Sequence, residues 1–255
     1  MLHYIKLIFR SILFLTALTV YIINRVKYSE KPFGKIGEEP LFATLIAIIF
    51  IIEMLLRFFP SSLESMGCQK QFAKNFIPTE CVKPTVNTAP TTFLVALVWI
   101  LLNGAIGVLY FTKLIDEGIL ALISLAYSVC DMICILFFCP FQTWIMKNKC
   151  CGSCRIYNWD YAMMFTPLVF IPSPYTYTVL GMALLLLIYW EIIFKIHPER
   201  FFENTNAGLS CVNCREKLCQ HKTQLRRFLR VNSKRLVLKG NAVIERVKEK
   251  ISKEK

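Results

Sequence analysis

Residues 92–111 read TFLVALVWILLNGAIGVLYF, a run of twenty residues that contains no charged side chain. A helix rises about 1.5 Å per residue, so the run is about 30 Å long, which matches the hydrocarbon core of a bilayer. A helix also satisfies its own backbone polar groups, as a segment in lipid must. The run therefore predicts a membrane span.

The composition of the whole chain agrees with a membrane protein. The 255 residues are 55% hydrophobic and have a mean hydropathy of +0.49, which is too apolar for an ordinary soluble domain. The formal net charge of +13 is concentrated at one end, because residues 222–255 hold twelve Lys or Arg against three Glu. Most of the basic excess is thus expected to belong to a tail outside the lipid.

Further apolar runs lie on both sides of this span. Residues 2–24 have no small-residue cleavage site and are predicted to be a retained helix. Residues 161–171 are short and interrupted by Pro167, which indicates either a broken, re-entrant helix or an interfacial segment. We therefore predict an all-α integral membrane protein with about five full transmembrane helices and one short broken helix. The remaining full spans are expected at residues 41–59, 118–139 and 176–195.

The distribution of basic residues predicts the orientation of the chain. If residues 161–175 enter the bilayer and the last helix returns to the same face, nine basic residues lie on that face and five on the other. The positive-inside rule then predicts that both termini lie in the cytoplasm. The membrane is expected to be the plasma membrane. The nine are Lys6, Arg10, Arg57, Lys70, Lys74, Lys83, Lys147, Lys149 and Arg155, and the five are Arg25, Lys27, Lys31, Lys35 and Lys113.

Two cysteine-rich segments would share this cytoplasmic face. Residues 210–222 read SCVNCREKLCQHK, and residues 149–155 read KCCGSCR. Two residues between paired cysteines let both thiolates turn toward one metal ion, and a histidine can complete a tetrahedron. The predicted ligands are Cys150, Cys151, Cys154, Cys211, Cys214, Cys219 and His221.

The cytoplasm is reducing, so these thiols are expected to bind a metal rather than form structural disulfides. Zinc is favoured, because sets of four cysteines, or of three cysteines and one histidine, are typical of zinc sites. An iron–sulfur cluster is the alternative, although neither standard ferredoxin spacing is present. Its ligands would be Cys151, Cys154, Cys211 and Cys214. A redox thiol pair and simple buried cysteines remain open as well.

Polar residues inside the predicted spans form a second group of candidates, because charges in lipid usually face the interior of a helix bundle. Counted from the cytoplasmic ends, Glu53, Asp131 and Glu191 share one half of the bilayer. In one interpretation Glu53 pairs with Arg57, four residues along the same helix, and the side chain of Glu191 reaches the membrane–water interface. The other interpretation is a polar cavity lined by Asp131, Glu53 and Asn103 that relays protons or binds a cation.

Asp131 has no basic residue within one turn of its own helix. Its charge is expected to be met by Arg57, or else Asp131 holds a proton or a cation. Asn158, Trp159 and Asp160 connect the Cys150 segment to the broken helix and are predicted to couple the metal site to the cavity. The alternative for Asp160 is a helix N-cap.

The chain is predicted to divide into a helical membrane domain, residues 1–195, a metal-binding segment, residues 196–222, and a basic tail, residues 223–255. The membrane domain includes the cytoplasmic loops 61–91 and 141–160. The tail alternates basic and apolar residues, which suits a helix on anionic lipid headgroups and disfavours nucleic acid. Its spacing after Gly240 also fits a dimerising helix, so a homo-oligomer stays open.

These features favour a membrane redox or metal-handling protein with a zinc or iron–sulfur site. A cation or proton transporter or channel with a structural metal site is the first alternative, and a membrane scaffold for a cytoplasmic partner is the second. Hydrolase and transferase motifs are absent, so the sequence leaves open whether the protein is an enzyme.

Overall fold

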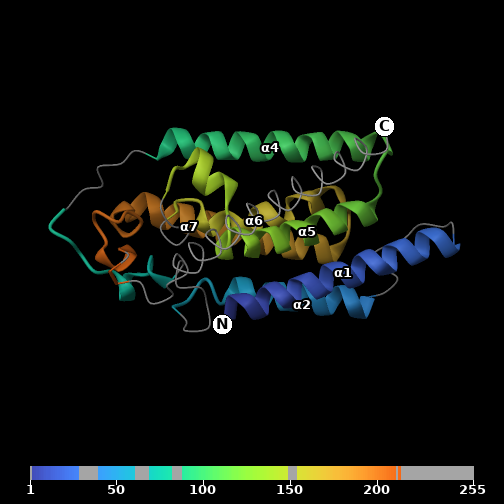
Figure 1. Ribbon diagram of the computed structural model, residues 1–255, viewed down its shortest axis with the longest axis horizontal. Coiled ribbons are helices and arrows are strands. Elements are labelled where there is room, and N and C mark those ends of the chain that lie inside the picture. Colours follow the sequence, from blue (N-terminus) through green and yellow to red (C-terminus); the bar gives the residue numbers. More distant parts are fainter. Residues whose placement is uncertain are drawn as a thin grey trace, which may run out of the picture. The chain divides into compact units, whose positions relative to one another are not determined.

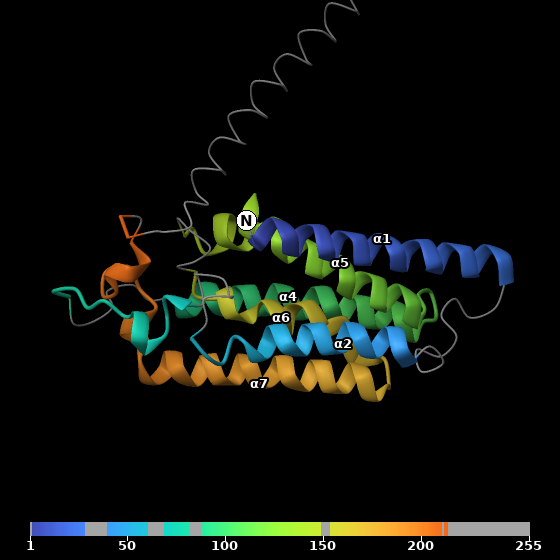
Figure 2. The same ribbon diagram turned by 90° about the horizontal axis from the view of Figure 1, so that it is seen from below.

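The apolar runs of the sequence form helices that lie alongside one another (Figures 1 and 2). The computed structural model describes residues 2–28, 40–60, 69–81, 88–148, 154–210 and 212–213, all within one unit, Met1–Glu216. The long helices are α1 (Leu2–Tyr28), α2 (Pro40–Leu55), α4 (Ala89–Phe111), α5 (Glu117–Leu136) and α7 (Pro174–Ile196), and α6 (Asp160–Phe165) is short.

Short turns of 3₁₀- or π-helix connect these elements in the described part of the chain. They are η1 (Ala73–Asn75), η2 (Phe141–Ile145), η4 (Tyr157–Trp159), η5 (Thr166–Phe170), η6 (Pro198–Arg200) and η7 (Ala207–Leu209).

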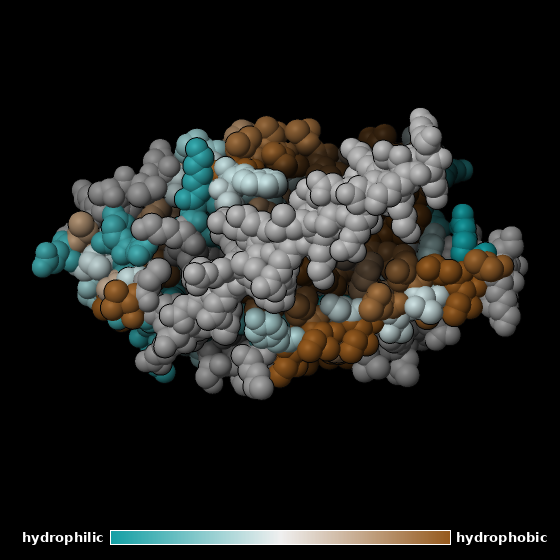
Figure 3. All heavy atoms as spheres, viewed as in Figure 1, coloured by the Kyte–Doolittle hydropathy of each residue, from teal (hydrophilic) through white to brown (hydrophobic). Residues whose placement is uncertain are grey.

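Four helices are long and apolar enough to cross a membrane: His3–Ile23 within α1, and all of α4, α5 and α7. The fifth expected span is shorter than predicted, because α2 ends at Leu55 after 16 residues and the chain then turns. Large apolar side chains are exposed along these helices, among them Ile100 and Leu101 of α4. Hydrophobic surface is visible along the top of Figure 3. Exposed apolar surface of this extent fits contact with lipid, so the described residues form a helical fold suited to an integral membrane protein.

Most loops and chain turns gather at one end of the helices, which we call the loop-rich end. It comprises the first turns of α1 and α4, the last turns of α2, α5 and α7, and residues 69–81 and 198–210 (Figures 1 and 2). A β-bridge joins Pro78 to Asn206, so the two loop segments hold each other in place. The carbonyl of Phe58, just after α2, also accepts a hydrogen bond from Tyr189 near the end of α7.

The proline-broken segment runs through the helical layer rather than along its surface. At the loop-rich end Arg155 contacts Glu191 of α7, and at the other end the ring of Phe170 packs 5.7 Å from that of Phe111, the last residue of α4. Between these points Tyr161 and Met164 are buried among the helices. Neighbouring helices thus cover the broken backbone, as irregular structure inside a membrane requires, which favours the re-entrant interpretation over the interfacial one.

Helix α4 packs against the broken segment through a glycine. A Cβ atom added at Gly107 would lie 2.6 Å from Cζ of Phe170, whereas one added at Gly104 would meet nothing within 4 Å. The missing side chain at Gly107 thus lets Phe170 approach the helix backbone.

Gly107→Ala is expected to destabilise the fold by about 1–3 kcal/mol, the usual cost of overpacking. The ring of Phe170 must move, and the contact between α4 and η5 loosens. Thermal unfolding of the protein in nanodiscs measures the effect. Gly104→Ala, three residues earlier on the same helix, is the control and should leave stability unchanged or raise it by about 1 kcal/mol. Equal effects of the two substitutions would contradict this packing.

Candidate functional site

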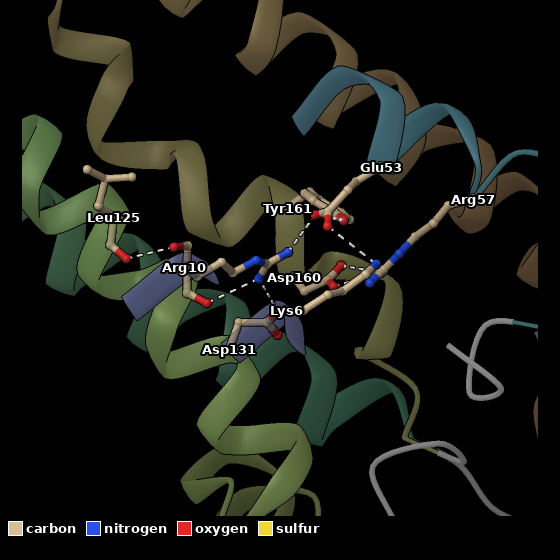
Figure 4. Close-up of polar contacts among 9 residues, drawn as sticks. Lys6, Arg10, Glu53, Arg57, Leu125, Asp131, Asp160 and Tyr161 are labelled. Atoms are coloured by element: carbon tan, nitrogen blue, oxygen red, sulfur yellow. Dashed lines mark hydrogen bonds and ion pairs between the residues drawn. The ribbon is translucent and has the colours of Figure 1, made fainter. Parts of the chain in front are cut away.

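A buried arginine of α1 joins three helices near the loop-rich end. Nη2 of Arg10 donates to Oε2 of Glu53 on α2 at 2.8 Å, and Nη1 donates to Oδ2 of Asp131 on α5 at 3.1 Å. The same Nη1 donates to the carbonyl of Ser128, and the Arg10 side chain is only 1% exposed. Figure 4 shows the guanidinium between the two carboxylates. One cation thus satisfies two acids that lie on different helices.

A second buried pair lies next to the first. Nη1 of Arg57, after the end of α2, lies 2.7 Å from the carboxylate of Asp160, the first residue of α6. The Arg57 guanidinium also faces the ring of Tyr161 at 4.6 Å, a favourable cation–π distance. Tyr161 donates its hydroxyl to Oε2 of Glu53 at 3.0 Å, and Lys6 pairs with the other oxygen of Glu53. Tyr161 therefore links the two pairs (Figure 4).

We call these seven side chains the buried ion network: Lys6, Arg10, Glu53, Arg57, Asp131, Asp160 and Tyr161. With every carboxyl and amine ionised, its three acids balance its three bases. Burial of unpaired charges costs several kcal/mol each, so this balance is what allows the network to lie between apolar helices. The network belongs to the half of the helical layer nearest the loop-rich end.

The segment 154–161 connects the network to the rest of that end. Arg155 and Trp159 both donate to the carboxylate of Glu191 on α7. Asn158 donates to Oε1 of Gln71 in the loop 69–81, and both of these side chains are buried. A change in the position of this segment must therefore move contacts to α2, Arg57, α7 and the loop together.

A cavity of about 140 Å³ lies beside the network, between α4, α5, η2 and α6. Asp131 and Asp160 belong both to the network and to the cavity wall. The aromatic part of the wall includes Trp99, Tyr127 and Phe141. Its sulfur-bearing residues are Cys130, Cys134, Cys139, Cys154, Met163 and Met164.

Most of the predicted metal ligands lie outside the described residues, namely Cys150, Cys151, Cys211, Cys214, Cys219 and His221. Cys154 is described, and it is a buried residue at the edge of the cavity. Within the described ranges, no group of three or more His, Cys, Asp or Glu side chains is arranged to hold a metal ion. The zinc and iron–sulfur assignments therefore remain predictions.

The predicted intramembrane residues have other ion-pair partners than those expected from the Glu53–Arg57 pair or from the polar cavity. Glu53 and Asp131 do meet, but through Arg10, so the basic partner of Asp131 is Arg10 and not the expected Arg57. Arg57 pairs with Asp160 rather than with Glu53 on its own helix, because α2 ends at Leu55 and the i,i+4 geometry is lost. Glu191 pairs with Arg155, a partner that neither interpretation named.

Two further expectations need correction. Asn103 does not join Asp131 and Glu53, because it is buried on α4 and donates to the carbonyl of Trp99 within its own helix. The expected cavity exists beside Asp131, but neither Glu53 nor Asn103 is among the described residues that line it. The structure places Trp159 at the N-cap of α6 and Asp160 at the first helical position, where its carboxylate pairs with Arg57.

Sequence reasoning missed the role of Arg10, which it treated as a basic residue near a helix end. A signal was available: Lys6 and Arg10 interrupt an apolar run at a spacing of four and so share one helix face. Cys130 and Cys134 have the same spacing, which places both on the cavity side of α5. The hydroxyl of Tyr161 gave no such signal.

Comparison with known proteins adds no family to this description. No protein-family model, curated protein or solved structure matches the chain. What the molecule does is therefore argued from its own geometry.

Proposed function

We propose that this integral membrane protein handles a metal ion or electrons through its Cys- and His-rich segments, which include Cys154 at the loop-rich end. Zinc is the favoured metal, and an iron–sulfur cluster is the alternative. The nine-to-five excess of basic residues favours a cytoplasmic position for this end. Labelling of intact cells with a membrane-impermeant thiol reagent tests this position, because a cytoplasmic Cys81, which is exposed in the structure, should not react.

One observation carries the proposal: the residues that follow Cys154 bond to α2, to Arg57 just after it, to α7 and to the loop 69–81. Cys154 itself is 3% exposed, and the partners of the residues after it are Glu191, Gln71, Arg57 and Glu53. A metal bound through Cys154 would fix the start of this segment. Metal binding or redox change would then act on the buried ion network through short, bonded steps.

Anaerobically purified full-length protein is expected to contain bound metal, and Cys154→Ala should weaken metal binding by at least about 100-fold, more than loss of an outer-shell partner does. Metal analysis and an absorption spectrum measure the bound metal. Colourless protein that contains zinc identifies a zinc site, and a visible charge-transfer band identifies an iron–sulfur cluster.

Cys139→Ala is the matched control, since Cys139 lines the same cavity but lies outside both cysteine-rich segments. Its metal content should equal that of the wild type. Protein without metal, or equal losses in the two variants, would overturn the proposal.

A cation or proton transporter is the second candidate, favoured by the position of Asp131 in both the ion network and the cavity wall. Intramembrane acids in such positions often mark ion pathways. Flux into proteoliposomes that persists after the metal is removed would favour this function over the first.

A further inference from the structure

Another cavity lies at the loop-rich end, and metal handling leaves it unexplained. Its volume is about 460 Å³, within the roughly 300–1,000 Å³ of ordinary ligand pockets. Its walls come from Thr88 at the start of α4, residues 146–148 after η2, Arg155, and residues 201–204. These segments are distant in the sequence, so the cavity is a product of the fold.

The position of the cavity fits the level of lipid headgroups. Thr88 directly precedes α4, one of the helices long and apolar enough to cross a membrane. Phe93 in the first turns of α4 and Trp144 of η2, three residues before Lys147, are each 69% exposed. An exposed tryptophan next to a span is typical of the membrane–water interface. A phospholipid headgroup in the cavity would therefore keep its acyl chains beside the apolar surface of α4.

Two opposite charges line the cavity without partners in the described part of the chain. They are Lys147 and Glu203, both exposed, and neither side chain forms an ion pair or a hydrogen bond with those residues. The charge of Arg155 is already met, because its guanidinium donates to Glu191 and lies 3.6 Å from the centre of the Phe194 ring. One positive and one negative charge remain, so the complementary ligand carries both signs and no net charge.

The positive side of the cavity suits a phosphate group. Lys147 has a φ of 49°, a left-handed conformation that is unfavourable for lysine. The turn is held because the N–H of Asn148 donates to the carbonyl of Gln142 at 3.0 Å, and Nε2 of Gln142 donates to the carbonyl of Asn148 at 2.7 Å. Thr88, the N-cap of α4, makes no capping bond with its side chain, and helix N-termini attract phosphate. Lys147 and the start of α4 thus both favour an anionic group here.

The negative side of the cavity suits a primary ammonium. Glu203 lies in a turn that the N–H of Asn206 closes on the carbonyl of Phe202 at 2.9 Å. The carbonyl of Asn204, next in the chain, accepts the hydroxyl of Thr79 at 2.5 Å, so the turn is fixed. A carboxylate only accepts hydrogen bonds, and a primary ammonium has three N–H donors. A quaternary ammonium has no N–H, so the carboxylate distinguishes the two cations.

From these features we propose that the cavity binds the phosphoethanolamine group of a membrane phospholipid, with the phosphate at Lys147 and the start of α4 and the ammonium at Glu203. Phosphatidylglycerol carries the phosphate but no cation for Glu203. Phosphatidylcholine carries a cation that cannot donate a hydrogen bond. The primary ammonium is thus the feature that distinguishes the proposed ligand.

The test measures equilibrium binding of tritiated dioleoylphosphatidylethanolamine to the full-length protein in detergent micelles. Phosphatidylcholine and phosphatidylglycerol with the same acyl chains are measured beside it, and micelles without protein correct for partitioning. We expect saturable binding of one phosphatidylethanolamine per chain, at least about tenfold tighter than binding of either other lipid, which corresponds to one hydrogen bond to a charged group.

Competition with water-soluble phosphoethanolamine identifies the source of the group. Displacement of the labelled lipid that is at least about tenfold weaker than displacement by unlabelled phosphatidylethanolamine would support the membrane as the source. Equal displacement by the soluble compound would overturn the lipid as the ligand.

Two variants separate the two ends of the ligand. Lys147→Met should weaken binding of phosphatidylethanolamine and of phosphatidylcholine by at least about tenfold, because both carry the phosphate. Glu203→Gln should abolish the preference for phosphatidylethanolamine over phosphatidylcholine. Lys74→Met and Glu80→Gln are the matched controls, exposed in the loop 69–81 and outside the cavity wall, and should leave both affinities unchanged.

Three results would each overturn the proposal: equal affinity for the three lipids, tighter binding of phosphatidylglycerol, or a preference for phosphatidylethanolamine that survives Glu203→Gln. The substituted side chains are exposed, so the variants are expected to fold as the wild type does. Should one of them fail to fold, the comparison of the three lipids in the wild type still decides the proposal.

Discussion

Arg10→Met is expected to lower the free energy of unfolding by about 3–5 kcal/mol, the effect typical of removing one partner from a buried ion pair. The substitution keeps the apolar stem of the side chain but removes the charge that Asp131 and Glu53 share. Glu53 retains Lys6 and the hydroxyl of Tyr161, whereas Asp131 loses the cation that it pairs with. Equilibrium unfolding in mixed micelles measures the loss.

Arg25→Met is the matched control, because Arg25 lies on the same helix and also pairs with an aspartate, Asp116, at 3.3 Å. Its side chain is 62% exposed, so its removal should change stability by no more than about 1 kcal/mol. Adding Asp131→Asn to Arg10→Met should restore part of the loss by removing the uncompensated carboxylate. If Arg10→Met and Arg25→Met behaved alike, Arg10 would not be the centre of the network.

Asp160→Asn is expected to have an effect of similar size, about 3–5 kcal/mol, because it leaves the guanidinium of Arg57 buried without its carboxylate. Arg57 is 2% exposed and Asp160 is 7% exposed, so water can replace little of the lost interaction. The double variant with Arg57→Met should be more stable than Asp160→Asn alone. Thermal unfolding of the single and double variants in nanodiscs checks this order.

The same change at Asp116 provides the comparison. Asp116 accepts a hydrogen bond from the backbone of Ile119 as the N-cap of α5, and asparagine caps helices about as well as aspartate. Asp116→Asn should therefore have little effect on stability. A stable Asp160→Asn protein that loses function would instead assign this carboxylate to chemistry rather than to the fold.

The two pairs differ in how they connect the protein. The Arg10 cluster joins α1, α2 and α5, while the Arg57 pair joins the end of α2 to the broken segment. Tyr161 lies between them and shares Glu53 with Arg10. We therefore expect substitutions in the two pairs to be non-additive, as is usual for members of one hydrogen-bonded network.

The positions of the helices could be predicted because they depend on local properties of the chain. Uninterrupted apolar runs of about twenty residues require helices in lipid, and Pro167 and the prolines at 172 and 174 require a break. The break indeed lies between η5 and α7, which begins at Pro174. The sequence also indicated that acids at 53 and 131 would share one half of the layer, because their depth follows from their distance to the helix ends.

The sequence by itself thus determined the helical class and four helices long enough to cross a membrane. Only the tertiary structure decided which charges meet, because the partners are 43 residues apart for Arg10 and Glu53 and 121 apart for Arg10 and Asp131. Helical periodicity fixes the face of a residue on its own helix but carries no information about which helix packs against that face. The cavity was decided in the same way, since its thiols, rings and carboxylates come from segments that only helix packing brings together.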